Sequence, residues 1–95
     1  MVLKSLRSAS FRAGYDRLMP DQKKAADAAF LRWKQDPRAV QYKPITQGKN
    51  LKSARIGKEG RAIAYERSGT VEWLWIGFNH RDYEKAIARL EALGY

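Results

Sequence analysis

The sequence has little of what metal-dependent enzymes use. Its 95 residues include no cysteine and one histidine, His80. There is therefore no disulfide framework, no thiolate nucleophile and no thiolate metal site, which fits a reducing compartment. In the middle of the chain Glu59 and Glu66 stand alone, so no carboxylate cluster offers ligands. We expect neither a metal ion nor another cofactor, and these absences argue against a metal nuclease.

Long apolar runs are also lacking. The first 15 residues have no stretch apolar enough for a signal peptide, and no part of the chain is apolar over the length of a membrane span. We expect a cytoplasmic protein without a membrane partner. The length suits one domain over residues 1–95, and the 44% hydrophobic content suits a chain that folds alone.

Basic residues are plentiful. The formal net charge is +9, and residues 38–67 hold eight Lys and Arg against two Glu, whereas residues 68–95 hold three against four Asp and Glu. Such a field concentrates anions and makes binding depend on salt. The charge favours nucleic acid or the ribosome as a partner, or an acidic protein.

The first part of the chain has the pattern of a strand and two helices. Residues 2–7 could form a short edge strand, and Ser8 or Ser10 could cap a helix that reaches about Met19. Pro20 breaks the chain and opens a second helix, whose alanine-rich apolar stripe ends at Asp36. The short turn between the two helices predicts an antiparallel helical hairpin.

Alternating patterns follow after residue 37. Residues 51–56, 61–67 and 71–78 read as three strands separated by glycine-containing turns, which predicts an antiparallel meander. In the last strand, strict alternation places Trp73 and Trp75 on one face, against the helical hairpin and Trp33, and Leu74 on the other. A final helix should start at Asn79 or His80 and close at Gly94.

These elements predict an α+β fold in which an N-terminal helical hairpin packs on a small antiparallel sheet, with a short C-terminal helix. With the helices on one face of the sheet, the other face is left available. Arg55 and Arg61 fall in adjacent strands, and Lys49 and Lys52 flank the first of them. We therefore expect a cluster of cationic side chains on or beside the open face.

An ordered set of motifs resembles the RelE/ParE superfamily of bacterial toxins. The matching segments are Tyr15 to Pro20, Asp36-Pro37, Arg55-Ile56-Gly57, Arg61 to Tyr65, Trp73 to Gly77, and His80 three residues before Tyr83. The resemblance implies a small cytoplasmic toxin of a type II toxin–antitoxin system, neutralised by a cognate antitoxin. RelE-like members are metal-independent endoribonucleases that cut mRNA in the ribosomal A site, whereas ParE-like members inhibit DNA gyrase.

The resemblance also implies roles for single residues. Arg61 matches an arginine that steadies the phosphate, although it could instead be a surface residue paired to Glu59 or Glu66. Arg55 lies near the place of a catalytic lysine, yet a guanidinium is a poor base. Tyr83 aligns with a tyrosine used near the nucleophile or for base stacking, but it also lies on the apolar stripe of the last helix.

Other residues complete the candidate site. Imidazole exchanges protons near neutral pH, so His80 is a candidate acid or base, or else only a helix cap. Candidate nucleic-acid contacts are Lys49, Lys52, Lys58 and Arg81. Three hypotheses remain: an mRNA endoribonuclease that inhibits translation, a gyrase inhibitor, and a non-catalytic basic module that docks an acidic partner or nucleic acid.

Overall fold

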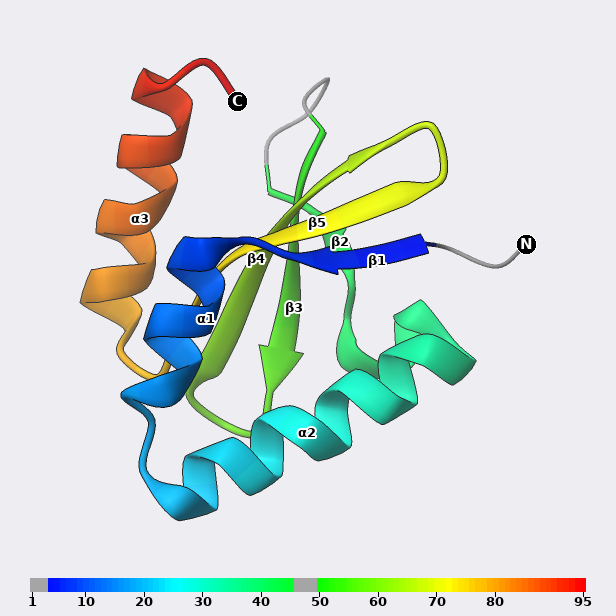
Figure 1. Cartoon of the computed structure of the whole chain (residues 1–95), viewed down its shortest axis with the longest axis vertical. Helices are drawn as coiled ribbons and strands as arrows, with labels where there is room; N and C mark the ends of the chain where they lie inside the picture. Colours follow the sequence, from blue (N-terminus) through cyan, green and yellow to red (C-terminus); the bar gives the residue numbers. More distant parts are fainter. Residues whose placement is uncertain (1–3, 46–49) are drawn as a thin grey trace.

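The computed structural model describes residues 4–45 and 50–95. Its sheet has five strands in the order β1-β5-β4-β3-β2, flanked by helices (Figure 1). The elements are β1 (Lys4–Arg7), α1 (Ala9–Asp16), α2 (Pro20–Gln35), the 3-10 helix η1 (Pro37–Val40), β2 (Lys43–Pro44), β3 (Leu51–Ile56), β4 (Gly60–Arg67), β5 (Thr70–Gly77) and α3 (His80–Ala92). The α+β fold predicted from the sequence is confirmed.

The predicted antiparallel meander is present in strands β3, β4 and β5. Ser68 and Gly69 join β4 to β5 with φ angles of 54° and 79°, the positive values that a tight hairpin turn of matching twist requires. The sheet as a whole is mixed, which corrects the prediction of an antiparallel sheet, because β1 pairs parallel with β5. Parallel pairing needs a long crossover, and here α1, α2 and the other strands lie between the two in sequence.

Helices α1 and α2 pack on one face of the sheet, as predicted. Ser8 caps α1, since its Oγ accepts a hydrogen bond from the Phe11 amide at 3.1 Å. α1 ends at Asp16, one turn before the predicted end, and α2 begins at Pro20 as predicted. Phe11 from α1 and Trp33 from α2 are buried in the same core cluster as Trp73 of β5. We call this side of the sheet the hairpin face.

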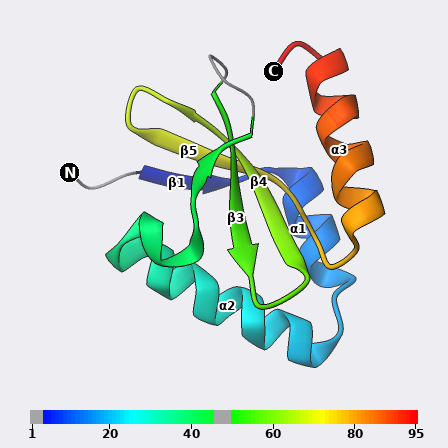
Figure 2. The same cartoon turned by 180° about the vertical axis from the view of Figure 1, so that it is seen from behind.

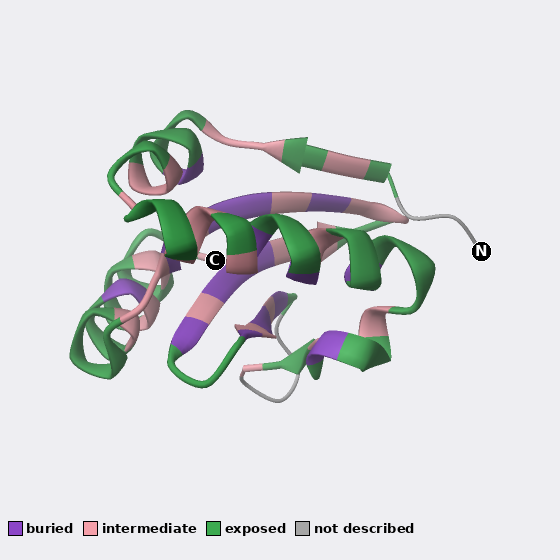
Figure 3. Cartoon of the chain, turned by 90° about the horizontal axis from the view of Figure 1, so that it is seen from below, coloured by how far each residue is buried: buried purple, intermediate pink, exposed green. Residues whose placement is uncertain are grey.

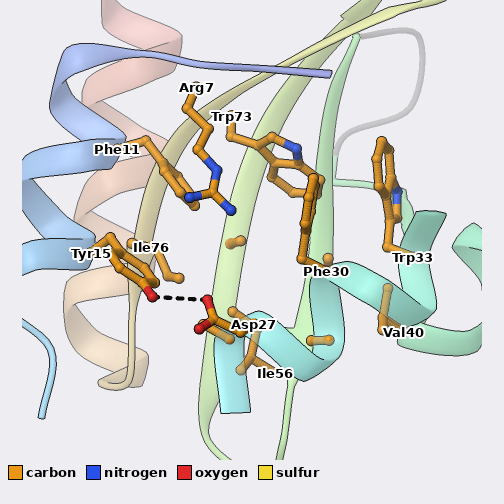
Figure 4. A pocket seen from close by; sticks show the side chains of 14 residues that line it. Arg7, Phe11, Tyr15, Asp27, Phe30, Trp33, Val40, Ile56, Trp73 and Ile76 are labelled. Atoms are coloured by element: carbon orange, nitrogen blue, oxygen red, sulfur yellow. Dashed lines mark hydrogen bonds between the residues drawn. The ribbon is translucent and has the colours of Figure 1, made fainter. Parts of the chain in front are cut away.

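An aromatic cluster forms the centre of this core. The Trp33 ring meets Trp73 edge-on with centroids 5.2 Å apart, and it meets Tyr42 in the same manner at 5.7 Å. Near them, the guanidinium of Arg7 lies over the rings of Phe11, Tyr15 and Phe30 at 5.0–5.7 Å. The guanidinium lines a cavity of about 30 Å³ between the two helices and the sheet, and Figure 4 shows it among the ring side chains of this pocket. The expectation that Trp33 would meet a strand tryptophan is confirmed for Trp73.

The predicted placement of Trp75 on the hairpin face is wrong. In the pairing of β4 with β5, Ala64 lies opposite Trp73, and its neighbour Ile63 lies opposite Trp75. Leu74 therefore has no partner in β4 and is the extra residue of a β-bulge. Alternation restarts after the bulge, and both Leu74 and Trp75 join the hydrophobic cluster on the opposite side of the sheet. Ile76 returns to the hairpin face.

Helix α3 covers part of that opposite side, which corrects the expectation that it is left open. Ala86 of α3 is buried in one cluster with Leu51, Ile63 and Leu74 from three strands. Figure 2 shows α3 beginning beside the β3–β4 turn and running along the sheet. Its outer surface is exposed, whereas the strands beneath are largely buried or half-buried (Figure 3). We call this side the α3 face; near the β3–β4 turn it carries Arg55 and Arg61.

Candidate nucleic-acid interface

Two arginines stand side by side on the α3 face. The register of β3 and β4 places Arg55 directly opposite Arg61, and that of β4 and β5 places Arg61 opposite Gly77. Side chains at directly opposed positions share a face and have Cβ atoms about 5 Å apart. The two arginines were predicted to lie in adjacent strands, and the structure brings them together in one row across the sheet.

Backbone carbonyls of the β3–β4 turn and of the first residue of β4 hold the two guanidinium groups. Arg55 donates from Nε to the Gly57 carbonyl at 3.1 Å and from Nη2 to the Lys58 carbonyl at 3.3 Å. Arg61 donates from Nη1 to the Gly60 carbonyl at 2.9 Å. Each guanidinium keeps further N–H groups, and its planar fork suits a phosphate.

The alternative reading of Arg61 as a partner of Glu59 or Glu66 finds no support. Among the described residues, neither Arg55 nor Arg61 forms an ion pair with a carboxylate. Glu66 instead accepts a hydrogen bond from the Tyr42 hydroxyl at 2.6 Å. Two like charges placed opposite one another repel, so the row has an unbalanced positive charge that an anion would relieve.

The first turn of α3 brings His80 and Tyr83 to the same end of the sheet. Asn79 caps this helix, because its Oδ1 accepts from the amides of Arg81 and Asp82 at 2.8 and 3.2 Å. The His80 side chain is 73% exposed, and its Nε2 lies 3.2 Å from Glu84 Oε1, one helical turn further on. The imidazole is thus accessible to a ligand and oriented by a carboxylate.

Tyr83 connects His80 to the sheet. Its ring centroid lies 6.0 Å from that of His80 and 6.0 Å from that of Trp75. Tyr83 is half-buried: it packs on the cluster under α3, as its place on the apolar stripe predicted, and its ring also lies beside His80. Its role near the nucleophile or in base stacking stays a prediction.

Sequence reasoning assigned Trp75 to the core and so missed it as a site residue. The indole is half-buried on the α3 face, in contact with Tyr83. A Cβ atom on Gly77 would lie only 2.6 Å from Cζ2 of that indole, so the ring occupies the space that a side chain at 77 would need. The glycine two residues after the tryptophan was the available signal, but the bulge that turns Trp75 to this face was not visible in the pattern.

The predicted lysine and arginine contacts divide between two places. Lys58 is exposed in the turn whose carbonyls bind Arg55, so it lies next to the row of arginines, and Arg81 is exposed in the first turn of α3. Lys52 lies opposite Ala64 on the hairpin face, away from Arg55, so it does not join the cationic cluster expected on the other face. Lys49 lies outside the described residues.

A groove runs between α1 and α3 along β5. Its volume is about 880 Å³, and apolar side chains such as Leu74 and Leu90 line it. Arg17, Lys85 and Arg89 add positive charge to its walls. The groove also reaches Trp75 and Gly77, so it adjoins the row of arginines.

Within residues 4–45 and 50–95, no three His, Cys, Asp or Glu side chains gather in a way that could hold a metal ion. In the same part of the chain, no helix has both the length and the apolar character needed to cross a membrane.

No protein-family model and no curated protein matches the sequence. Solved structures do resemble it. The RelBE2 toxin–antitoxin complex from Mycobacterium tuberculosis contains a chain that matches with a TM-score of 0.66 and 19% identity, over 83% of this chain and 100% of that one. A RelB-RelE antitoxin–toxin complex from Methanococcus jannaschii contains a chain that matches with a TM-score of 0.68 and 12% identity, over 84% of this chain and 96% of that one.

A third similar structure is the RelE-RelB complex from Pyrococcus horikoshii, with a TM-score of 0.65 and 15% identity over 85% of this chain and 99% of that one. The three matches span most of this chain and nearly all of the matched chains. The molecule described here therefore has the fold of the RelE toxins.

Proposed function

We propose that this chain is the toxin of a type II toxin–antitoxin pair and that it cuts mRNA on the ribosome without a metal ion. The observation that carries the proposal is the row formed by Arg55 and Arg61, which has no carboxylate partner among the described residues and which the rings of Trp75 and Tyr83 link to the accessible imidazole of His80. The shared fold with RelE toxins supports it. Such a toxin would act in the cytoplasm, where ribosomes lie.

RNA cleavage without a metal uses the neighbouring 2′-hydroxyl as nucleophile. The 2′-oxygen bonds to phosphorus, the bond from phosphorus to the 5′-oxygen breaks, and the products end in a 2′,3′-cyclic phosphate and a 5′-hydroxyl. One group must take the proton of the 2′-hydroxyl, another must protonate the 5′-oxygen, and positive charge must stabilise the five-coordinate phosphorus.

Four residues of the candidate site could meet these needs. Arg61 and Arg55 contact the non-bridging phosphate oxygens, for which their remaining N–H groups are suited. His80, oriented by Glu84, accepts the proton of the 2′-hydroxyl, and a solvent water protonates the departing 5′-oxygen. Tyr83 holds the nucleotide next to the imidazole.

The other basic residues serve as RNA contacts in this proposal. Lys58 in the β3–β4 turn and Arg81 in the first turn of α3 would bind flanking phosphates. Lys52 lies on the hairpin face and would contact a more distant part of the RNA or of the ribosome. For Lys49 the contact remains a prediction from the sequence.

An antitoxin is the second partner in the proposal. The groove between α1 and α3 combines an apolar lining with Arg17, Lys85 and Arg89, which suits an amphipathic segment that carries acidic residues. Because the groove extends to Trp75 and Gly77, a segment seated there would reach the edge of the RNA site. Binding of antitoxin and of RNA would then compete.

Induced expression in bacteria tests the proposal. Mapping of RNA ends should reveal discrete cuts in messages under translation, and the cuts should vanish with Arg61→Ala. Lys34→Ala, on the outer surface of α2, is a matched control that removes one exposed charge and should leave the cuts in place. Growth arrest with intact messages would refute the ribonuclease activity.

Inhibition of DNA gyrase is the second candidate, and one observation favours it. Arg55 stands where the resemblance to RelE-like ribonucleases places a lysine, and its guanidinium is bound to two carbonyls, so it offers no base. A gyrase inhibitor would stop supercoiling and leave RNA intact. A non-catalytic module would keep its effect in His80→Gln and lose it when Arg55 and Arg61 are reversed in charge.

A further inference from the structure

The three tryptophans of this chain differ in their environment. Trp33 and Trp73 are 3% and 4% exposed in the core under the helices. Trp75 is half-buried on the α3 face, and its centroid lies 6.0 Å from that of Tyr83. It is therefore the large aromatic side chain of β5 that a ligand on the α3 face can reach.

Gly77 sets the position of the indole beside Arg61. The register places Gly77 directly opposite Arg61, and Cζ2 and Cη2 of Trp75 lie 2.6 and 2.7 Å from where a Cβ of residue 77 would be. The indole thus takes the place of a side chain at 77, one strand away from the arginine. Neighbouring strands are about 4.8 Å apart, so the ring and the base of the Arg61 side chain are close neighbours.

This arrangement joins an anion contact to an aromatic surface. In single-stranded RNA each phosphate is followed by a base with a flat π-face, and sequence-tolerant binding proteins pair basic residues with stacking rings. Tyr83 and His80 continue the aromatic surface from Trp75, with successive centroids 6.0 Å apart. The order along the site is therefore arginine, indole, phenol, imidazole.

We propose that Trp75 is a stacking platform for one base of single-stranded RNA, next to the phosphate that Arg61 holds. The inference rests on the proposed function, which it deepens by assigning a base-binding subsite. Trp75 positions the nucleotide and takes no part in proton transfer. Because stacking has no hydrogen-bond readout, the subsite accepts different bases and contributes affinity more than sequence choice.

Gly77 has a defined part in this subsite. An alanine at 77 would overlap the indole by its Cβ alone, so the ring must leave its position. The φ angle of Gly77 lies outside the left-handed region, so the backbone accepts alanine and the change acts on Trp75. Gly77→Ala should therefore mimic loss of the platform while the tryptophan itself is retained.

The contribution of base stacking to affinity is measured with the purified full chain and two oligomers of equal length. One is single-stranded RNA with 2′-O-methyl groups, which cannot be cut, and the other is a sugar–phosphate oligomer without bases. Affinities come from fluorescence anisotropy of the labelled oligomers at one fixed salt concentration, because phosphate contacts vary with salt. A change in intrinsic tryptophan fluorescence reports contact of the RNA with the Trp75 indole, since the other two tryptophans, Trp33 and Trp73, are buried.

We expect RNA to bind the wild type more tightly than the abasic oligomer does and to quench the tryptophan emission. Trp75→Leu should weaken RNA binding by about 5- to 100-fold and leave abasic binding unchanged, and Gly77→Ala should weaken it in the same sense. Trp75→Phe, which keeps a flat ring, should restore much of the affinity. Circular dichroism of each variant establishes that it is folded.

Equal affinity of the wild type for the two oligomers would overturn the platform. So would a Trp75→Leu variant in which the binding of both oligomers is weakened alike, and so would an absence of RNA binding. Cleavage of mRNA on ribosomes, assayed separately, tests the proposed function. Cleavage without base-dependent binding refutes the platform alone. Base-dependent binding with intact mRNA refutes the ribonuclease and supports the platform.

Discussion

Replacing Tyr42 by phenylalanine removes one hydrogen bond from the edge of the core. The Tyr42 hydroxyl donates to Glu66 Oε1 at 2.6 Å, and both residues are half-buried between η1, β4 and the Trp33 ring. A hydrogen bond to a charged group is worth about 1.5–3 kcal/mol, and Tyr42→Phe leaves the carboxylate without its donor. We expect a loss of about 2 kcal/mol, which lowers the Tm by about 8–16 °C for a domain of this size.

The pH dependence of this loss has a definite sign. Burial, and then the hydrogen bond to Glu66, raise the pKa of Tyr42 far above that of a free tyrosine. In the unfolded chain tyrosine ionises near pH 10, so the stabilisation is complete below that pH and is lost as pH rises above it. The difference in stability between wild type and Tyr42→Phe should therefore shrink between pH 9 and about pH 11.

Urea unfolding at several pH values measures both effects. Tyr15→Phe is the matched control, because Tyr15 donates to Asp27 at 2.8 Å on the exposed surface, where the same bond is screened by water. The control should lose much less stability than Tyr42→Phe. Equal losses, or a Tyr42→Phe difference that stays constant up to pH 11, would refute this reasoning.

Three further predictions concern the site. Gly60→Ala should cost about 1–3 kcal/mol in urea unfolding, because its Cβ would lie 2.6 Å from the Ile56 carbonyl oxygen, and a stability equal to wild type would contradict that packing. Arg55→Gln should reduce the slope of log affinity for single-stranded RNA against log salt by about 0.7, whereas an unchanged slope would exclude a phosphate contact. His80→Gln should slow mRNA cleavage by about 10²- to 10⁴-fold with RNA affinity retained, and a wild-type rate would remove His80 from the chemistry.

The sequence predicts the elements well where a local signal controls them. Pro20 begins α2, Asn79 caps α3, and the Ser68-Gly69 turn joins two strands of the meander, each as expected. The short η1 and the two-residue β2 were not predicted, because neither is long enough to show a periodicity. The parallel pairing of β1 also escaped prediction, since it depends on packing over the whole sheet.

At the site, a single extra residue in β5 limited what could be predicted from the sequence. Alternation alone assigns Trp73 and Trp75 to the same face, and the bulge at Leu74 separates them. Nothing local marks this bulge, because Leu74 is an ordinary strand residue and is buried on the α3 face. The pairing of Arg55 with Arg61 was predictable, since a short turn between two strands fixes their register.

Cleavage of a defined mRNA on purified ribosomes tests the central claim most directly. Wild-type protein, without added metal beyond what the ribosomes need, should produce a fragment with a 5′-hydroxyl end. Arg61→Ala should remove that product, and Arg61→Lys should restore only part of it, because a lysine lacks the planar fork. An mRNA left intact by folded wild-type protein, or cut equally by Arg61→Ala, would contradict the account.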